Sequence, residues 1–307
     1  MTGRKLLKRQ KLRNNEYYDM QSVFDELYEN SLAKCEFKNL ISIITAEENI
    51  RLAYRNLKKN AGSRTPGTDG KTIADLAKMS EPELIGFVQQ KFNWYQPQSV
   101  RRKEIPKGNG KTRPLGIPNI MDRLIQQCVL QVMEPICEAK FCETSNGFRP
   151  NRGVENALAQ AEKHMQKSNL HIVIDIDIKG FFDNVNHGKL LRQIWTMGIH
   201  DKKLLSIISA MLKAEVAGIG FPEKGTPQGG ILSPLLSNIV LNELDWWITS
   251  QWVGMPTRHE YSGKIHENGT KDQSKKYREL RKTNLKECYI VRYADDFKIF
   301  CRKCVHR

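Results

Sequence analysis

Three aspartate residues carry the most distinctive chemistry in the sequence. Asp177 lies near the end of an alternating apolar segment, and Asp295 and Asp296 lie between two other apolar segments. Hard cations such as Mg²⁺ bind carboxylate oxygens, and two such ions about 4 Å apart can promote phosphoryl transfer to a sugar hydroxyl. Each aspartate taken alone is ordinary, because aspartate is common in turns. The chemistry therefore depends on whether the fold brings the three side chains together.

Both aspartate positions lie in segments with the period of β-strands. The segment LHIVIDIDI, residues 170–178, alternates strictly, so its isoleucines fall on one face and Asp175 and Asp177 on the other. Residues 288–301, CYIVRYADDFKIFC, predict a strand, a tight turn at ADD and a second strand. A strand end beside a hairpin tip would place acids from distant parts of the chain at one point.

Helical periodicity is the main signal in several other segments. Apolar residues recur at helical spacing between residues 17 and 60, and Ser80 with Glu83 has the form of a capping box that starts another helix. A further apolar stripe predicts a helix that begins near Asn119.

Two segments are basic without a helical apolar stripe. Between residues 98 and 118, lysines and arginines crowd around Asn109-Gly110, which predicts a β-hairpin with a basic surface. The segment 253–287 is polar and basic with no apolar period. It is either a loop that contacts RNA or a solvated surface excursion, and the pattern does not separate the two.

The composition indicates a globular protein with a polyanionic partner. Of the 307 residues, 39% are hydrophobic and 27% are charged, which argues against a disordered chain, and the length suits two or three packed subdomains. The formal net charge is +15, and such a surplus favours nucleic acid, because each lysine or arginine beside a phosphate releases condensed counterions. A merely soluble basic protein is the alternative that charge alone leaves open.

Cysteine usage and hydropathy indicate an intracellular protein. The seven cysteines are odd in number and lie mostly in apolar runs, as expected for buried thiols in a reducing compartment. Cys301 and Cys304 form a C-x-x-C pair followed only by His306, so we do not expect a zinc site. No run approaches the roughly 20 apolar residues of a membrane span, and the basic N-terminus lacks a signal peptide's apolar region. We expect cytoplasmic localisation, of bacterial or organellar type, without a membrane partner.

Five long motifs occur in one order along the chain. They are IPKGNGKTRPLGIP at 105–118, NGFRPNRG at 146–153, DIKGFFDNVNH at 177–187, GTPQGGILSPLLSNIVLNELD at 225–245 and VRYADDF at 291–297. These motifs resemble those of reverse transcriptases, in the form found in group II intron-encoded proteins, also called intron maturases. The segment through PGTDG resembles the N-terminal extension of that family, so the likeness covers nearly the whole chain.

The resemblance implies an α+β fold, the fingers and palm of a right-hand polymerase, with an antiparallel palm sheet backed by helices. Residues 1–95 would form a basic arm and a helical N-terminal extension, and residues 96–170 would form the fingers. Residues 171–307 would form the palm, with the insert at 253–287. Proteins of this family continue into a thumb after the YADD hairpin, so we expect this chain to be truncated before the thumb.

The resemblance also implies an RNA-directed DNA polymerase that transfers a nucleotide to a primer 3′-hydroxyl with two Mg²⁺ ions. Asp177 and Asp295 would be the main catalytic metal ligands, with the backbone carbonyl of Ile178, and Asp296 would be a weaker ligand. The ions would activate the hydroxyl and stabilise charge on the α-phosphate and the pyrophosphate. Asp175 matches no metal position of the family, so we interpret it as structural or electrostatic.

Contacts with the incoming nucleotide would come from five other positions in the family pattern. Gln228 and the backbone of Gly229 would line the deoxynucleoside triphosphate, and Phe182 would exclude a ribose 2′-hydroxyl by its bulk. Lys107 and Arg113 of the basic hairpin would hold the triphosphate, and Arg113 could do so with two parallel hydrogen bonds.

The implied partners are nucleic acids. Tyr293 would contact the primer end, and Arg101 would contact phosphate. The chain would bind intron RNA, an RNA template with a DNA primer, and deoxynucleoside triphosphates. A homodimer is compatible with the sequence.

Three other functions compete with this polymerase, which would also assist splicing and mobility of its intron. A mainly non-catalytic RNA-binding splicing module would recognise folded intron RNA by shape and phosphate contacts, but the intact aspartates argue against a purely non-catalytic lineage. The bulky Phe182, and Ala294 before the acidic pair, count against an RNA-dependent RNA polymerase. A retron-like enzyme fits less well, because the PQGG loop and the N-terminal extension suit an intron protein better.

Overall fold

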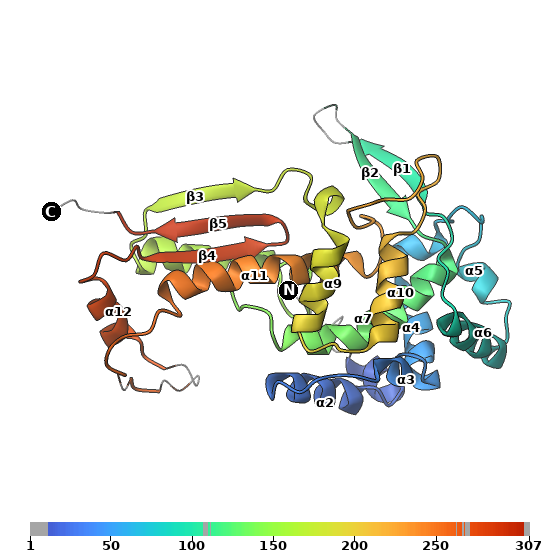
Figure 1. Ribbon diagram of the computed structural model, residues 1–307, viewed down its shortest axis with the longest axis horizontal. Coiled ribbons are helices and arrows are strands. Elements are labelled where there is room, and N and C mark those ends of the chain that lie inside the picture. The colour runs from blue at the N-terminus through green and yellow to red at the C-terminus, as the bar shows by residue number, and fades with distance from the viewer. Residues whose placement is uncertain are drawn as a thin grey trace. The chain divides into compact units, whose positions relative to one another are not determined.

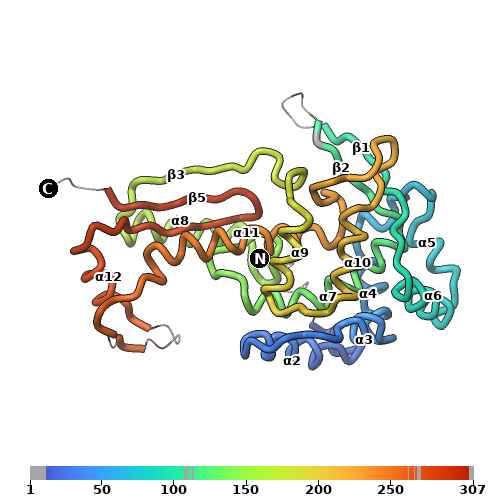
Figure 2. The backbone as a smooth tube through the Cα atoms, viewed as in Figure 1, coloured from blue at the N-terminus to red at the C-terminus, as the bar shows by residue number. Residues whose placement is uncertain are grey.

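The computed structural model describes residues 12–303 except 107–109, 111, 262, 266 and 268–270. Contacts within the chain define two compact units, whose elements are drawn in Figures 1 and 2. Unit 1 contains Met1–Phe141 and Lys179–Val240, and unit 2 contains Cys142–Ile178 and Leu241–Arg307. Each unit is therefore built from two separate stretches of the sequence.

Unit 1 is a helical body with one β-hairpin. Its helices and 3₁₀ turns are α2 (Gln21–Leu32), α3 (Leu40–Ile44), α4 (Glu47–Lys59), η1 (Ala61–Arg64), α5 (Ile73–Leu76), α6 (Glu81–Asn93), α7 (Ile120–Glu138), η3 (Phe181–Asn184), α9 (His187–Thr196) and α10 (Lys202–Leu212). Helices α2, α3 and α4 pack against α7, as Figure 1 shows. The predicted stripe of α7 is confirmed, because Leu124, Ile125 and Cys128 are fully buried. The capping box of α6 is also confirmed, with the Ser80 amide donating to Glu83 at 2.8 Å.

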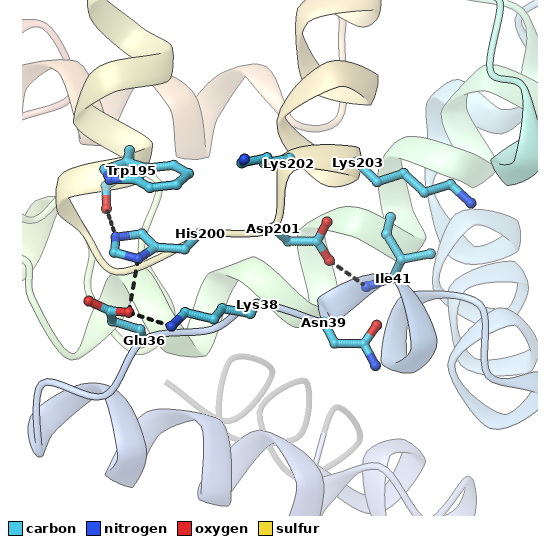
Figure 3. A pocket seen from close by; sticks show the side chains of 9 residues that line it. All are labelled: Glu36, Lys38, Asn39, Ile41, Trp195, His200, Asp201, Lys202 and Lys203. Atoms are coloured by element: carbon cyan, nitrogen blue, oxygen red, sulfur yellow. Dashed lines mark hydrogen bonds and ion pairs between the residues drawn. The ribbon is translucent and has the colours of Figure 1, made fainter.

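Asp201 caps two helices of unit 1 at once. One carboxylate oxygen accepts from the amides of Leu40 and Ile41 at the start of α3, at 2.8 and 3.1 Å. The other oxygen accepts from the Leu204 amide in the first turn of α10, at 3.0 Å. Figure 3 shows this carboxylate between the two helices. A single buried side chain thus satisfies amides from segments about 160 residues apart in the chain.

The predicted basic hairpin is confirmed in its strands. β1 (Arg101–Pro106) pairs antiparallel with β2 (Thr112–Ile117) along their full lengths. The side chains of β1 after Arg101 are exposed, as expected for a charged strand outside the core. Much of the tip lies outside the described residues, so the turn at Asn109-Gly110 stays a prediction.

Unit 2 is built on a three-stranded antiparallel sheet. Its strands are β3 (Ile172–Asp177), β4 (Cys288–Tyr293) and β5 (Asp296–Cys301), in the order β3-β5-β4. Its helices are α8 (Val154–Glu162), the π-helical turn η2 (Lys163–Lys167), the part of α11 (Ser233–Trp252) from Leu241 onward, and α12 (Ser274–Leu280). The strand, tight turn and strand predicted at 288–301 are confirmed, and the predicted strand at 170–178 is β3 with shorter ends.

One face of this sheet packs on α11. Ile176, Ile290 and Phe297 project to this face and form an apolar cluster with Leu244 and Ile248 of the helix. Alternation of side chains along each strand assigns these residues to one side of the sheet. This cluster holds the strand ends near the ADD turn against a helix.

The opposite face is covered at one end only. Val291 and Phe300 pack there with Leu170 and with Ala157 and Ala161 of α8. Helix α8 contacts β4 here, and Figure 2 labels it beside the sheet. The other end of the same face, at the C-terminus of β3, carries exposed polar side chains.

The insert contains structure that its sequence does not predict. Helix α12 lies within it, and Tyr277 of this helix stacks on Trp252 with ring centroids 6.0 Å apart. Glu287, at the end of the insert, is buried between Arg281 and Arg302. Burial opposes the charge of this carboxylate, but hydrogen bonds from the two arginines outweigh it and lower the pKa of Glu287 to about 2. The described part of the insert is therefore anchored within unit 2.

The predicted boundaries at residues 95 and 170 follow functional parts of a polymerase, whereas the two units follow compactness, so those boundaries stay predictions. Among the helices that the structure describes, none is both long enough and apolar enough to cross a bilayer.

Candidate active site

Asp177, Asp296 and Tyr293 form a row across the sheet of unit 2. Asp177 ends β3 and lies directly opposite Asp296, the first residue of β5. Asp296 in turn lies opposite Tyr293, the last residue of β4. Directly opposite residues of antiparallel strands project to the same face, with Cα atoms about 4.5–5.5 Å apart. The two carboxylates and the phenol therefore share the open end of the face.

Asp295 lies beside this row in the turn between β4 and β5. Because Tyr293 pairs with Asp296, the turn has only two central residues, Ala294 and Asp295. The described residues with positive φ include Ala294, at +58°, but not Asp295, which is the pattern of a type II′ hairpin turn. The structure thus brings three aspartates from two distant parts of the sequence to one end of one sheet.

The donor chemistry of this end of the sheet fits Mg²⁺. The three aspartates offer hard carboxylate oxygens, and Ile178, whose carbonyl is a predicted ligand, directly follows Asp177. Within the described part of the chain, no three His, Cys, Asp or Glu side chains converge as a formed metal cluster. Like charges repel at short range, so a bound cation would be what draws these carboxylates together.

Asp175 projects to the same face but has a different partner. Its cross-strand neighbour on β5 is Lys298, and the two charged groups lie 2.7 Å apart. Both side chains are about half exposed or more. This ion pair agrees with an electrostatic role for Asp175.

In unit 1, Phe182 lies beside the TPQGG loop. The Phe182 carbonyl accepts from the Thr226 amide at 2.7 Å, and the Gly225 amide donates to the Val185 carbonyl at 2.7 Å. The Nε2 atom of His187 lies 2.7 Å from the Gly225 carbonyl. These bonds join η3 to the loop, so Phe182 is held next to the residues predicted to line the nucleotide.

Gly229 occupies a position in the loop where no side chain fits. A Cβ atom there would lie 2.1 Å from the carbonyl oxygen of Gly116 on β2. Gln228, the preceding residue, is half-buried. The strand that carries Arg113 therefore touches the loop that carries Gln228 and Gly229.

The predicted phosphate contacts of the hairpin are placed only in part. Arg113 belongs to β2, but its side chain and the whole of Lys107 lie outside the described residues. Arg101 opens β1 and is half-buried, and its Nε atom has no hydrogen-bond partner among the described residues. The roles of these three residues stay predictions.

Sequence reasoning missed two buried charged residues behind the ADD turn. Arg292 and Asp245 are both fully buried and form an ion pair at 2.7 Å. Burial raises the pKa of the Asp245 carboxyl, against the effect of its hydrogen bonds from Arg292. The signal in the sequence is one arginine inside the apolar strand CYIVRY, because a buried charge requires a partner.

A pocket of about 820 Å³ lies elsewhere in unit 1, between the segment before α3 and the start of α10 (Figure 3). Trp195 and His200 stack in its wall with ring centroids 4.1 Å apart. His200 also contacts Glu36 at 3.3 Å. None of the predicted site residues is among the described residues that line this pocket.

Residues 105–306 match the family described as reverse transcriptase (RNA-dependent DNA polymerase), and the chain belongs to this family. Its mixed fold, with small antiparallel sheets and surrounding helices, is the fingers and palm of a reverse transcriptase. Its relatives place it with the reverse transcriptases and maturases of group II introns.

Two relatives define the extent of the likeness. The chain is 34% identical to Protein YkfC of Escherichia coli (strain K12) over 275 residues, which cover 86% of this chain and 71% of the relative. It is 37% identical to the group II intron-encoded protein LtrA of Lactococcus lactis subsp. cremoris over 240 residues, which cover 74% of this chain and 38% of the relative. The chain therefore spans little more than a third of the second protein.

A yeast relative and a solved structure extend the comparison. The putative COX1/OXI3 intron 1 protein of Saccharomyces cerevisiae is 28% identical, over 90% of this chain and 35% of the relative. A partial Cas6-RT-Cas1–Cas2 complex aligns with 20% identity and a TM-score of 0.47, over 87% of this chain and 39% of that chain.

Proposed function

We propose that this chain is the polymerase part of a group II intron-encoded protein: an RNA-directed DNA polymerase that also binds its intron RNA to assist splicing and mobility. The observation that carries the proposal is the row of Asp177, Asp296 and Tyr293, with Asp295 beside it on the turn. This row lies at the open end of a sheet face, where a primer and template could approach.

In this proposal, Asp177 and Asp295 would hold two Mg²⁺ ions together with the carbonyl of Ile178, and Asp296 would contribute more weakly. When bound, the ions activate the primer 3′-hydroxyl and stabilise charge on the α-phosphate and the pyrophosphate. The protein supplies rigid placement, because ladder hydrogen bonds fix the backbone of Asp177 against that of Asp296. Tyr293, in the same row, borders the primer end.

Unit 1 supplies the proposed contacts with the incoming deoxynucleoside triphosphate. Gln228 and the Gly229 backbone line the nucleotide, and Phe182 excludes a ribose by contact with its 2′-hydroxyl. The hydrogen bond between Phe182 and Thr226 supports this assignment, since it holds the gate and the loop in one arrangement. Lys107 and Arg113 bind the triphosphate, and Arg101 binds a backbone phosphate.

The second candidate function is an RNA-binding splicing module that acts mainly without catalysis. The net charge of +15 and the exposed strand β1 favour this function, because exposed cations bind a phosphate backbone independently of sequence. The two candidates share the RNA partner and differ in whether the aspartates are needed.

Primer extension on an RNA template with a DNA primer and Mg²⁺ separates the candidates. The chain is offered deoxynucleotides or ribonucleotides, and Asp295→Asn is the matched variant, since it removes one charge without changing size. Binding of intron RNA is measured for both proteins over a range of salt concentrations, and thermal unfolding shows that both are folded.

We expect extension with deoxynucleotides only, loss of extension in Asp295→Asn, and equal RNA binding by both proteins. RNA affinity should fall steeply with salt if many phosphates are contacted. A folded chain that binds RNA tightly but never extends a primer would contradict the polymerase and leave the splicing module.

A further inference from the structure

We propose that Arg292 is the positioning residue of the ADD turn: its guanidinium fixes the Ala294–Asp295 peptide and so sets the direction of the Asp295 carboxylate. This inference rests on the proposed polymerase function, because it assigns to Arg292 a role in placing a metal ligand. It starts from the hydrogen bonds of one fully buried side chain.

The Arg292 guanidinium divides its donors between a helix and the turn. Its Nε and Nη2 atoms donate to the two carboxylate oxygens of Asp245 on α11, at 2.7 to 3.0 Å. Its Nη1 atom donates to the carbonyl of Ala294, at 2.7 Å. The planar fork of an arginine makes these bonds at once in a fixed geometry. Through this side chain, the turn is tied to α11.

The Ala294 carbonyl belongs to the one peptide whose orientation defines the turn. In a two-residue hairpin turn, the peptide between the central residues can flip, which converts type II′ into type I′. The flipped turn needs positive φ at its second residue, and this residue is Asp295, a residue type that tolerates such a conformation. Without the bond from Arg292, both orientations would be accessible. With it, the type II′ turn seen here is selected.

Stability alone does not account for the buried pair. Taking two charges out of water carries a large desolvation cost, and apolar residues of similar volume often stabilise a protein as well as a buried pair does. What apolar residues cannot do is hold the Ala294 carbonyl. The specific contribution of Arg292 is therefore geometric.

A second contact confines the backbone at the start of the turn, at the Tyr293–Ala294 peptide, and leaves the Ala294–Asp295 peptide to Arg292. A Cβ atom at Gly147 would lie 2.2 Å from the Ala294 nitrogen, so the backbone of the NGFRPNRG loop lies in direct contact with the turn. The same loop pairs with β4, because the Arg292 amide donates to the Thr144 carbonyl and the Asn146 amide donates to the Arg292 carbonyl, both at 2.9 Å. The turn is thus held by a loop as well as by a helix.

The test separates positioning from folding by a paired replacement. In Arg292→Met/Asp245→Leu, the buried charges are removed together, so the variant should fold, but the Ala294 carbonyl loses its donor. Arg292→Lys is the conservative variant, since a compact ammonium cannot reproduce the fork. Arg281→Lys is the control, because Arg281 also pairs with a buried carboxylate, but its hydrogen bonds go to Glu287 and not to the turn.

Three quantities are measured on the whole chain: the thermal midpoint, the steady-state kinetics of primer extension (kcat with KM), and Mn²⁺ binding followed by electron paramagnetic resonance. We expect kcat to fall by about tenfold to a hundredfold in the paired variant, as for a misplaced reacting group, while the KM for deoxynucleotide changes by less than about threefold. Mn²⁺ binding should weaken in the paired variant and in Arg292→Lys, and Arg281→Lys should leave all three quantities near the parent values.

A folded paired variant with the parent's kcat and Mn²⁺ affinity would overturn the positioning role. If the paired variant does not fold, the kcat and the Mn²⁺ affinity of Arg292→Lys decide instead, and parent values of both would overturn the positioning role. If the parent chain itself extends no primer, the polymerase proposal fails, and Mn²⁺ binding still reports whether Arg292 shapes the turn.

Discussion

Asp177 and Asp296 are direct cross-strand partners, although they lie on strands contributed by distant parts of the chain. Strand register places both carboxylates on one face of the sheet. Side chains alternate along a strand, so a slip of one residue between β3 and β5 would move one of the two carboxylates to the face covered by α11. The apolar cluster on α11 therefore fixes the acidic row as well as the core.

The two exposed acids of β3 should differ sharply in their effect on activity. Asp177→Asn removes a proposed metal ligand, and we expect primer extension to fall by about a hundredfold or more. Asp175→Asn breaks only the exposed ion pair with Lys298, which contributes about 1 kcal/mol or less, so extension should stay within about threefold. Comparable losses in both variants would show that the overall acidity of the strand matters, rather than the position of Asp177.

Phe182 should control the choice of sugar. We expect Phe182→Ala to admit ribonucleotides, because the smaller side chain leaves room for the 2′-hydroxyl. Discrimination against ribonucleotides should fall by about tenfold to a hundredfold. The measurement is kcat/KM for a deoxynucleotide and for the matching ribonucleotide. Phe221→Ala is the control, since Phe221 is 77% exposed in the same unit. Unchanged discrimination in Phe182→Ala would make Phe182 an ordinary packing residue.

Asp201 should stabilise unit 1 through its two caps. Asp201→Ala leaves the first amides of α3 and α10 without acceptors, and we expect the free energy of unfolding to fall by about 2–3 kcal/mol. Asp201→Asn keeps one acceptor oxygen and should lose about half as much. Urea unfolding measures both changes, and an unaltered midpoint in Asp201→Ala would contradict the double cap.

His164 should make folding sensitive to acid. It stacks on both Tyr289 and Phe300, with ring centroids 4.7 and 5.5 Å apart, and burial lowers its pKa to about 4. The unfolded chain takes up this proton near the usual pKa of about 6.5, so stability is lost as pH falls from about 6.5 to about 4 and changes no further below that range. The loss should be roughly 2 kcal/mol, allowing for partial exposure.

The His164→Phe variant isolates this contribution, because phenylalanine keeps the stacking and does not titrate. The difference in unfolding free energy between variant and parent should grow in favour of the variant as pH falls from 6.5 to 4. A difference that is constant over this range would show that His164 titrates equally in the folded and unfolded chains.

The elements that sequence predicts well are those with a one-sided burial pattern. Helix α7 and the β4–β5 hairpin bury one face each, and this burial imposes a period that is visible without coordinates. Helix α12 escapes prediction because its seven residues are too few to show a period, and its position depends on a ring contact between Tyr277 and Trp252.

The sequence likewise identifies some features of the candidate site and not others. Residue types and motif resemblance indicate Asp177, Asp295 and Asp296, but their shared face follows from strand register, which the sequence alone does not state. The pairing of Arg292 with Asp245 spans 47 residues, and the sequence shows that a buried charge needs a partner without showing which one.

The outer edge of β3 has a consequence for handling the protein at high concentration. Among the described residues no strand pairs with this edge, and Ile172, Val173 and Ile174 on it are 42%, 41% and 45% exposed. An open, apolar edge is a template on which a strand from another molecule can add, and charges next to it oppose that addition. The ion pair of Asp175 with Lys298 supplies such charges at the next position along the strand. Self-association through β3 is therefore the expected route of aggregation. Neutralising Asp175 would remove a charge that opposes it and should increase aggregation.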